Sequence, residues 1–82
     1  MGFLKESGKY CHPYGRLEET HIALESAKKA CEQNERCIAI YDYNCDNKGR
    51  LVLCNDFRRI RKSASQKSCV YTRDDGKYGD QI

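Results

Sequence analysis

Six cysteines in a chain of 82 residues constrain this sequence more than any other feature. An even number of cysteines spread through so short a chain is typical of a disulfide framework, which forms in an oxidising compartment. Hydrophobic residues make up 39% of the chain and charged residues 33%, so the apolar core is small for the charge around it. We therefore expect one secreted or extracellular domain with three disulfides, each worth about 2–4 kcal/mol. The cysteines are Cys11, Cys31, Cys37, Cys45, Cys54 and Cys69.

The spacing of the cysteines disfavours the other uses of this residue. A structural zinc site draws pairs of ligands two to four residues apart, so that one turn presents both sulfurs to the ion, and the closest cysteines here are further apart. A C-x-x-C redox motif is missing as well. We expect neither a metal nor a cofactor.

One helix is predicted over residues 24–33, where the sequence reads LESAKKACEQ. Leu24, Ala27 and Cys31 recur at helical spacing and form one narrow apolar stripe. Asn34 is a residue type that ends helices in the left-handed conformation. The stripe predicts that the helix packs on one face only, with the sulfur of Cys31 in the core.

Runs rich in β-branched and aromatic residues predict the strands. Residues 37–43 and 50–54 flank a polar loop and suggest a hairpin, 68–73 form a third candidate, and 16–22 form a weaker fourth. One helix on a small antiparallel sheet is the natural arrangement of these elements, which is an α+β fold. The polar segments 1–9 and 74–82 carry no cysteine, so we expect flexible ends around an organised domain at 10–73.

The order of these elements resembles the PAN/apple superfamily over roughly residues 10–72. The matching features are the helix L-E-x-A-K-x-A-C, the C-x5-C spacing that leads into a strand, and a hairpin with two more cysteines. The matching residues are Leu24, Glu25, Ala27, Lys28, Ala30, Cys31, Cys37 and the strand 38–43. Six cysteines leave fifteen pairings open by themselves. The resemblance implies a helix cradled by a curved sheet and the nested pairs Cys11–Cys69, Cys31–Cys54 and Cys37–Cys45.

The segment 57–62, FRRIRK, is the sharpest local signal for a ligand. Short basic runs of this kind bind heparin-like polyanions, and guanidinium groups donate paired hydrogen bonds to sulfate oxygens. The alternative is a solvated loop in which Phe57 and Ile60 turn inward as anchors. The candidate polyanion-binding residues are Arg58, Arg59, Arg61, Lys62 and Lys67, and Arg50 and Arg73 flank them in the sequence.

Six tyrosines are a second signal, because a tyrosine ring covers apolar contacts while its hydroxyl offers a hydrogen bond. We interpret Tyr41, Tyr43 and Tyr71 as sheet residues that fill or flank the core. Tyr10 and Tyr14 are freer to bind a ligand, and Tyr78 falls in the tail.

The sequence gives little support for four other functions, which are catalysis, calcium binding, nucleic-acid binding and membrane insertion. His12 and His21 lie in no recognisable nucleophile motif, so we expect no enzyme. The Asp42-x-Asn44-x-Asp46 pattern imitates the start of a calcium loop, but it lacks the glycine and the final glutamate, and we interpret it as turn chemistry. The net charge is only +3, and the helical stripe is too narrow to lie on a bilayer.

The sequence favours an extracellular, non-enzymatic recognition module that binds a protein or a carbohydrate, with a sulfated glycan on the basic segment. Because PAN/apple members act in adhesion, clotting and attachment, the resemblance implies the same class of function. One alternative is a secreted effector: a toxin, a protease inhibitor or an antimicrobial protein. Another is a module of a larger matrix or adhesive protein.

Overall fold

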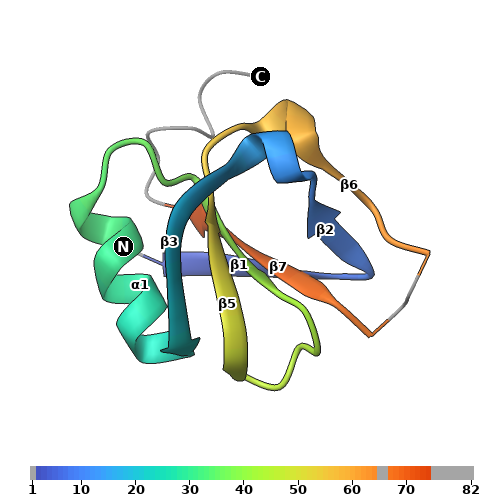
Figure 1. The fold of residues 1–82 in the computed structure, drawn as a ribbon, viewed down its shortest axis with the longest axis horizontal. Coiled ribbons are helices and arrows are strands. Elements are labelled where there is room, and N and C mark those ends of the chain that lie inside the picture. Colours follow the sequence, from blue (N-terminus) through green and yellow to red (C-terminus); the bar gives the residue numbers. More distant parts are fainter. Residues whose placement is uncertain (1, 65–66, 75–82) are drawn as a thin grey trace.

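In the computed structural model of this chain, residues 2–64 and 67–74 are described. They form a five-stranded antiparallel sheet with one helix, and a short two-stranded ribbon (Figure 1). The predicted α+β class is therefore confirmed. In chain order the elements are β1 (Gly2–Ser7), β2 (Lys9–Cys11), the 3-10 turn η1 (Pro13–Gly15), β3 (Arg16–Ala23), α1 (Leu24–Gln33), β4 (Ala39–Asp42), β5 (Lys48–Cys54), the 3-10 turn η2 (Phe57–Arg59), β6 (Ile60–Lys62) and β7 (Cys69–Asp74).

The sheet has the strand order β1-β7-β4-β5-β3, with β4 at its centre. The predicted β4–β5 hairpin is confirmed, with Tyr41 opposite Val52. Side chains alternate between the two faces of a strand, so Leu51 and Leu53 join one core while Val52 and Cys54 join the other. Each face of the sheet therefore has a core of its own.

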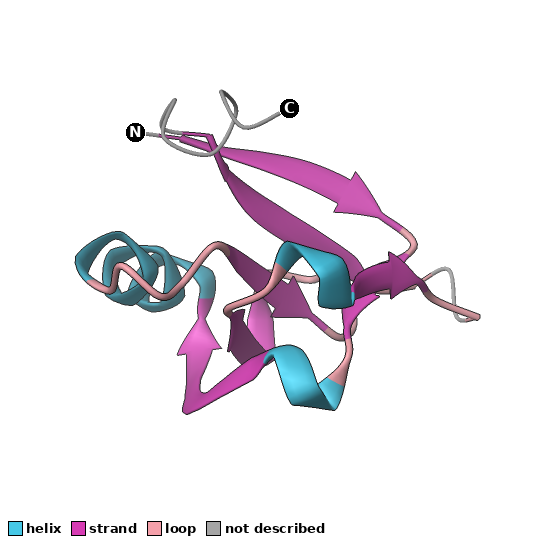
Figure 2. Ribbon diagram, turned by 90° about the horizontal axis from the view of Figure 1, so that it is seen from above, coloured by secondary structure: helices cyan, strands magenta, loops and turns pink. Residues whose placement is uncertain are grey.

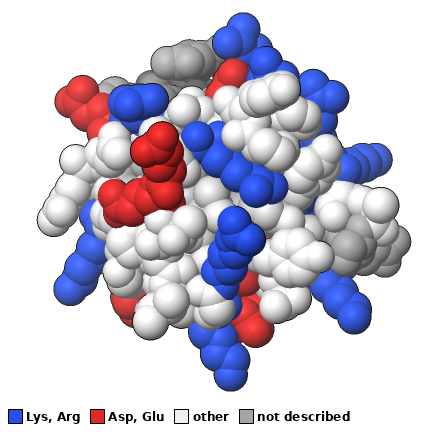
Figure 3. Space-filling view, in the orientation of Figure 1, with Lys and Arg blue, Asp and Glu red and all other residues white. Residues whose placement is uncertain are grey.

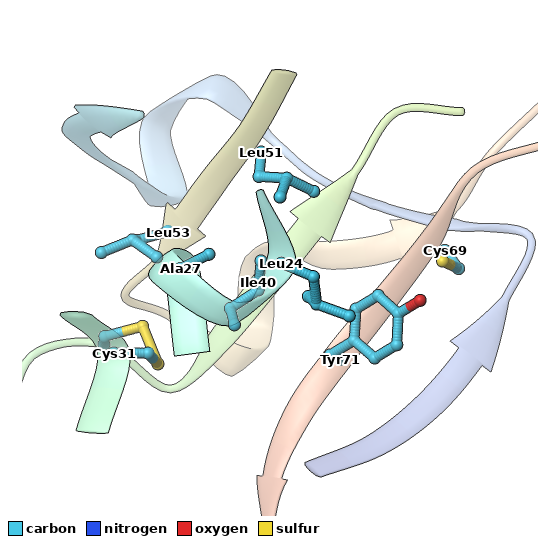
Figure 4. Close-up of a cluster of buried hydrophobic side chains, with 9 residues drawn as sticks. Leu24, Ala27, Cys31, Ile40, Leu51, Leu53, Cys69 and Tyr71 are labelled. Carbon is cyan, nitrogen blue, oxygen red and sulfur yellow. A yellow bond between two sulfur atoms is a disulfide. The ribbon is translucent and has the colours of Figure 1, made fainter. Parts of the chain in front are cut away.

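The first core lies between the sheet and α1, which occupies a layer of its own beside the strands (Figure 2). The helix has the predicted bounds, and its buried residues are those of the predicted stripe. These side chains face the buried leucines of β5 and the ring of Tyr71 (Figure 4). The second core lies between the opposite face and the β2–β6 ribbon, where Cys11 and Ile60 meet Val52 and Val70.

The N-terminal segment 1–9 was expected to be flexible, and this is wrong for the residues that the structure describes. β1 pairs with β7 along its whole length, from Gly2 opposite Asp74 to Ser7 opposite Cys69. The sequence of β1 does not alternate and its side chains are mostly exposed, so backbone pairing rather than a hydrophobic pattern places it. Of the predicted tail 74–82, Asp74 ends β7 and the rest lies outside the described residues.

The disulfides are Cys11–Cys54, Cys31–Cys37 and Cys45–Cys69, with Cα–Cα distances of 6.2, 5.1 and 5.2 Å. Cys11–Cys54 joins the ribbon to the central sheet, and Cys31–Cys37 joins the end of α1 to the segment that enters β4. Cys45–Cys69 joins the hairpin loop to β7. All six cysteines are thereby bonded.

None of the three nested pairs implied by the PAN/apple resemblance is formed, and the faces of the strands explain why. Cys31 and Cys69 lie in the core on the helix side, whereas Cys11 and Cys54 lie in the core on the ribbon side. The sheet itself therefore separates Cys11 from Cys69 and Cys31 from Cys54. The third pair, Cys37–Cys45, would have to span β4, whose four residues extend about 13 Å, beyond the reach of a disulfide.

Asn34 caps the helix, but not in the left-handed conformation that the sequence suggested. Instead, the side chain of Arg73 on β7 binds the carbonyl groups at the helix end. Asn34 is extended, with φ −118°, and its backbone N–H donates to the carbonyl of Cys31. The Nη1 atom of Arg73 lies 3.1 Å from the Cys31 carbonyl oxygen, 3.3 Å from that of Asn34 and 3.1 Å from that of Cys37. A buried guanidinium thus satisfies carbonyls at the negative end of the helix dipole.

We predict that replacing the Cys11–Cys54 pair by alanines lowers the free energy of unfolding more than replacing Cys31–Cys37. The first bridge closes a separation of 43 residues and the second one of 6. Loop-closure entropy then gives about 4 kcal/mol for the first and about 2 kcal/mol for the second. Urea unfolding of the two double variants measures the difference. Equal losses would contradict this entropic ranking.

We predict that Arg73→Met lowers the free energy of unfolding by about 2–3 kcal/mol, because the carbonyls at the end of α1 lose a charged donor. Methionine keeps the apolar stem, so the loss reports on the hydrogen bonds. Thermal denaturation followed by circular dichroism measures it. A melting temperature equal to that of the native chain would show that Arg73 does not hold the helix end.

Candidate functional site

The basic segment 57–62 is divided between two elements. Its first half is η2, and its second half is β6, which pairs with β2. Ile60 packs against the ribbon-side core, as the alternative interpretation of this segment proposed. Phe57 is 42% exposed, which shows that it is buried less than the inward anchor that the alternative interpretation proposed.

The two arginines of η2 are held by Asp56. The Nε atom of Arg58 lies 3.2 Å from the Asp56 carboxylate, and that of Arg59 lies 4.0 Å from it. The backbone N–H of Arg58 also donates to this carboxylate and, with the arginine side chain, holds the pKa of Asp56 below its ordinary value. Asp56 is therefore ionised at neutral pH and offsets part of the positive charge of η2.

The two cations of β6 are the uncompensated part of the segment. Arg61 lies opposite Tyr10 in the β2–β6 register, and Lys62 lies opposite Lys9. The side chains of Arg61 and Lys62 are exposed and make no ion pair with any residue that the structure describes. Lys9 adds a third cation, whose ammonium lies 2.8 Å from the carboxylate of Glu6. We call Lys9, Arg61 and Lys62 the basic ribbon.

An open depression of about 380 Å³ adjoins the basic ribbon. Two lysines and two serines line it, on the residues Ser7, Gly8, Lys9, Lys62 and Ser63. Ammonium groups beside hydroxyls are suitable donors for a sulfate or carboxylate oxygen. The sequence could not indicate this depression, because it depends on a β2 strand that the sequence pattern did not predict.

The remaining cations of this region separate into exposed and structural ones. Lys67 is exposed and precedes Ser68, whose carbonyl accepts from the N–H of Gly8 near the depression. Arg73 is buried under the helix end, so it is not available to a ligand. Figure 3 shows Lys and Arg side chains at the upper right, where Figure 1 places β6, and also through the centre and along the lower edge of this face, while a patch of acidic side chains lies left of centre.

The tyrosines follow the sequence interpretation in two of three cases. Tyr41 and Tyr71 are each 7% exposed, and burial raises the pKa of both phenols above the ordinary value. Tyr43 is 61% exposed, so it does not fill the core, and the prediction that it is a sheet residue is wrong. The reason is that β4 ends at Asp42, one residue before it. Tyr14 is 81% exposed, and Tyr10 is half-buried.

A polar network that the sequence analysis missed joins β3 to the first turn of α1. The Nδ1 atom of His21 lies 2.7 Å from the Ser26 hydroxyl, and its Nε2 atom contacts the carboxylate of Glu19. Both hydrogen bonds are exposed, so this arrangement does not exclude water as a catalytic relay would. We interpret it as a structural link, and the spacing E-x-H-x4-S was its signal in the sequence.

The loop between β4 and β5 shows what the calcium-like pattern does. The fully buried carboxylate of Asp42 accepts backbone hydrogen bonds from Cys45, at 2.9 Å, and Asn47, at 2.8 Å. These two residues have positive φ, at 56° and 65°. Asp42 therefore holds a tight turn together, which is the turn chemistry that the sequence suggested.

No family model matches the chain, and neither the curated proteins nor the solved structures contain a match. Over the described residues, no cluster of three or more His, Cys, Asp or Glu is placed to hold a metal ion. No helix in that part of the chain is long and apolar enough to cross a bilayer.

Gly15 sets how closely η1 approaches η2. A Cβ atom at Gly15 would lie 2.4 Å from the Cβ of Arg59, which is closer than atoms can approach. The same contact lets the Gly15 carbonyl accept from the N–H of Asn55, and lets the Arg59 guanidinium lie 5.8 Å from the centre of the Tyr14 ring. The absence of a side chain at Gly15 therefore allows η2 to pack against η1, and so sets the position of β6, which follows η2.

We predict that Gly15→Ala lowers the free energy of unfolding by about 1–3 kcal/mol, because the added methyl group forces η1 and η2 apart. The matched control is Gly2→Ala, where an added Cβ meets no atom within 4 Å. Urea unfolding measures both variants. Equal stability of the two would contradict the packing argument.

Proposed function

We propose that this protein is an extracellular, non-enzymatic recognition module that binds a sulfated glycan through the basic ribbon. The observation that carries the proposal is the pair Arg61 and Lys62, which are exposed, uncompensated and fixed on a strand. Lys9 is the cross-strand partner of Lys62 and shares its face, although the Glu6 carboxylate, 2.8 Å from its ammonium, offsets part of its charge. Three disulfides support a secreted location, because such bonds persist in oxidising compartments.

The chemistry of the basic ribbon favours sulfate as the group recognised. A guanidinium donates two parallel hydrogen bonds to an oxyanion, and an ammonium beside it contributes charge without fixing the geometry. Lys9 and Lys62 are cross-strand partners and share one face of the ribbon, while Arg61, next to Lys62 on β6, projects from the other face. A glycan chain would therefore contact all three cations along the edge of β6 rather than on one face. The neighbouring depression brings Ser7, with its hydroxyl donor, beside the two lysines.

A recognition module is favoured over a membrane-active effector by the burial of α1. Its apolar residues, Leu24, Ala27 and Cys31, all face the core. The helix has no second apolar face that could enter a bilayer. We retain kinship with the PAN/apple superfamily as part of the proposal. It rests on the helix and strand pattern at residues 24–43 rather than on the disulfides.

We predict that the native chain is retained on immobilised heparin at an ionic strength of about 0.15 M, and that salt weakens retention by screening. Arg61→Gln with Lys62→Gln should raise the Kd at least about tenfold, because two charge-assisted contacts are lost. These side chains are exposed, so the double variant keeps its fold. We avoid substituting Arg59, since its side chain packs against Gly15.

The matched control is Lys29→Gln with Arg36→Gln, which removes the same charge from exposed positions on α1 and the loop after it. The control should elute close to the native chain. Elution of the two double variants at the same salt concentration would show that only net charge matters, and would remove the basic ribbon as the site.

A further inference from the structure

A small pocket of about 120 Å³ opens on the ribbon side of the sheet, apart from the basic ribbon itself. Its lining residues are Arg16, Tyr41, Tyr43, Arg50 and Val52. Val52 and Tyr41 are partners in the β4–β5 register, and Arg50 precedes Val52 by two residues on β5, on the same face. Because the pocket is built on the paired strands β4 and β5, its lining is held in place before a ligand binds.

Two guanidinium groups line this pocket, and none of the described residues along it is acidic. Arg16 is positioned by its Nε atom, which donates to the Cys11 carbonyl at 2.8 Å, and its guanidinium carbon lies 5.1 Å from the centre of the Tyr41 ring. Arg50 is exposed and makes no ion pair with any described residue. The pocket therefore carries positive charge that the described chain does not neutralise.

Two tyrosine rings line the pocket, and one of them is exposed. The Tyr41 and Tyr43 rings lie 6.3 Å apart in an edge-to-face arrangement, and the Tyr10 ring continues the row 6.4 Å from Tyr41. Tyr41 is buried, but Tyr43 is 61% exposed. The exposed Tyr43 ring and the unpaired Arg50 line the same pocket, so one ligand can contact both.

We propose that this pocket binds a single carboxylated sugar, such as a hexuronate. The planar carboxylate matches the fork of a guanidinium and would lie between Arg50 and the free nitrogens of Arg16. The C–H face of a pyranose is apolar and slightly positive, so it packs against the negative face of the Tyr43 ring. The proposal goes beyond glycan binding by the basic ribbon, because the ligand is one sugar and the residues are different.

The experiment is an NMR titration of the full chain with methyl β-glucuronide, methyl β-glucoside and acetate. We expect the glucuronide to shift the signals of Tyr43 and Arg50 with a Kd of about 1 mM, which is the range for a ligand of this size. The glucoside lacks the carboxylate, and acetate lacks the sugar ring. Each should therefore bind at least about tenfold more weakly than the glucuronide.

Variants locate the site. Arg50→Gln and Tyr43→Ser should each weaken glucuronide binding at least about tenfold, whereas Arg58→Gln, an exposed arginine outside the pocket, should leave it unchanged. The basic-ribbon variant Arg61→Gln with Lys62→Gln should also bind glucuronide normally, which separates this site from the proposed heparin site. Glucuronide that binds no better than acetate or the glucoside, or that is lost in the basic-ribbon variant alone, would overturn the proposal.

Discussion

The Cys11–Cys54 disulfide joins strand β2 to strand β5, and so attaches the β2–β6 ribbon to the face of the sheet opposite the helix. The ribbon is only three residue pairs long, too short to be stable by itself in water. Both candidate binding surfaces depend on this attachment. The basic ribbon lies on β2 and β6, and the carbonyl that positions Arg16 in the pocket belongs to Cys11 itself.

Local sequence pattern predicted the helix, the four main strand regions and the α+β class, because each follows from the spacing of apolar residues within a short window. It missed β1, whose pairing with β7 uses backbone groups that carry no sequence signature. The predicted disulfide pairing was wrong for a related reason. Whether two cysteines can meet depends on which face of the sheet each occupies, and Cys54 faces away from Cys31 although Leu53 beside it faces the helix.

The candidate site was predictable only as a set of charges. In the sequence, Arg58, Arg61 and Arg73 are equivalent cations near one another. In the structure, Arg58 is paired with Asp56, Arg61 is open to solvent, and Arg73 is buried against helix carbonyls. The contribution of Lys9 required pairing between distant segments, which no window of the sequence contains. The pocket likewise required β3 to bring Arg16 beside the β4–β5 hairpin.

The pairing of β1 with β7 has an architectural consequence. Gly2 lies directly opposite Asp74, so the first and last described residues lie side by side at one end of the β1–β7 pair. β1 then runs away from that end for six residues, about 20 Å, before the chain enters the basic ribbon. The cationic strands β2 and β6 therefore lie at the far end of β1 from the two ends of the described chain, where a host protein joined to those ends would not cover them.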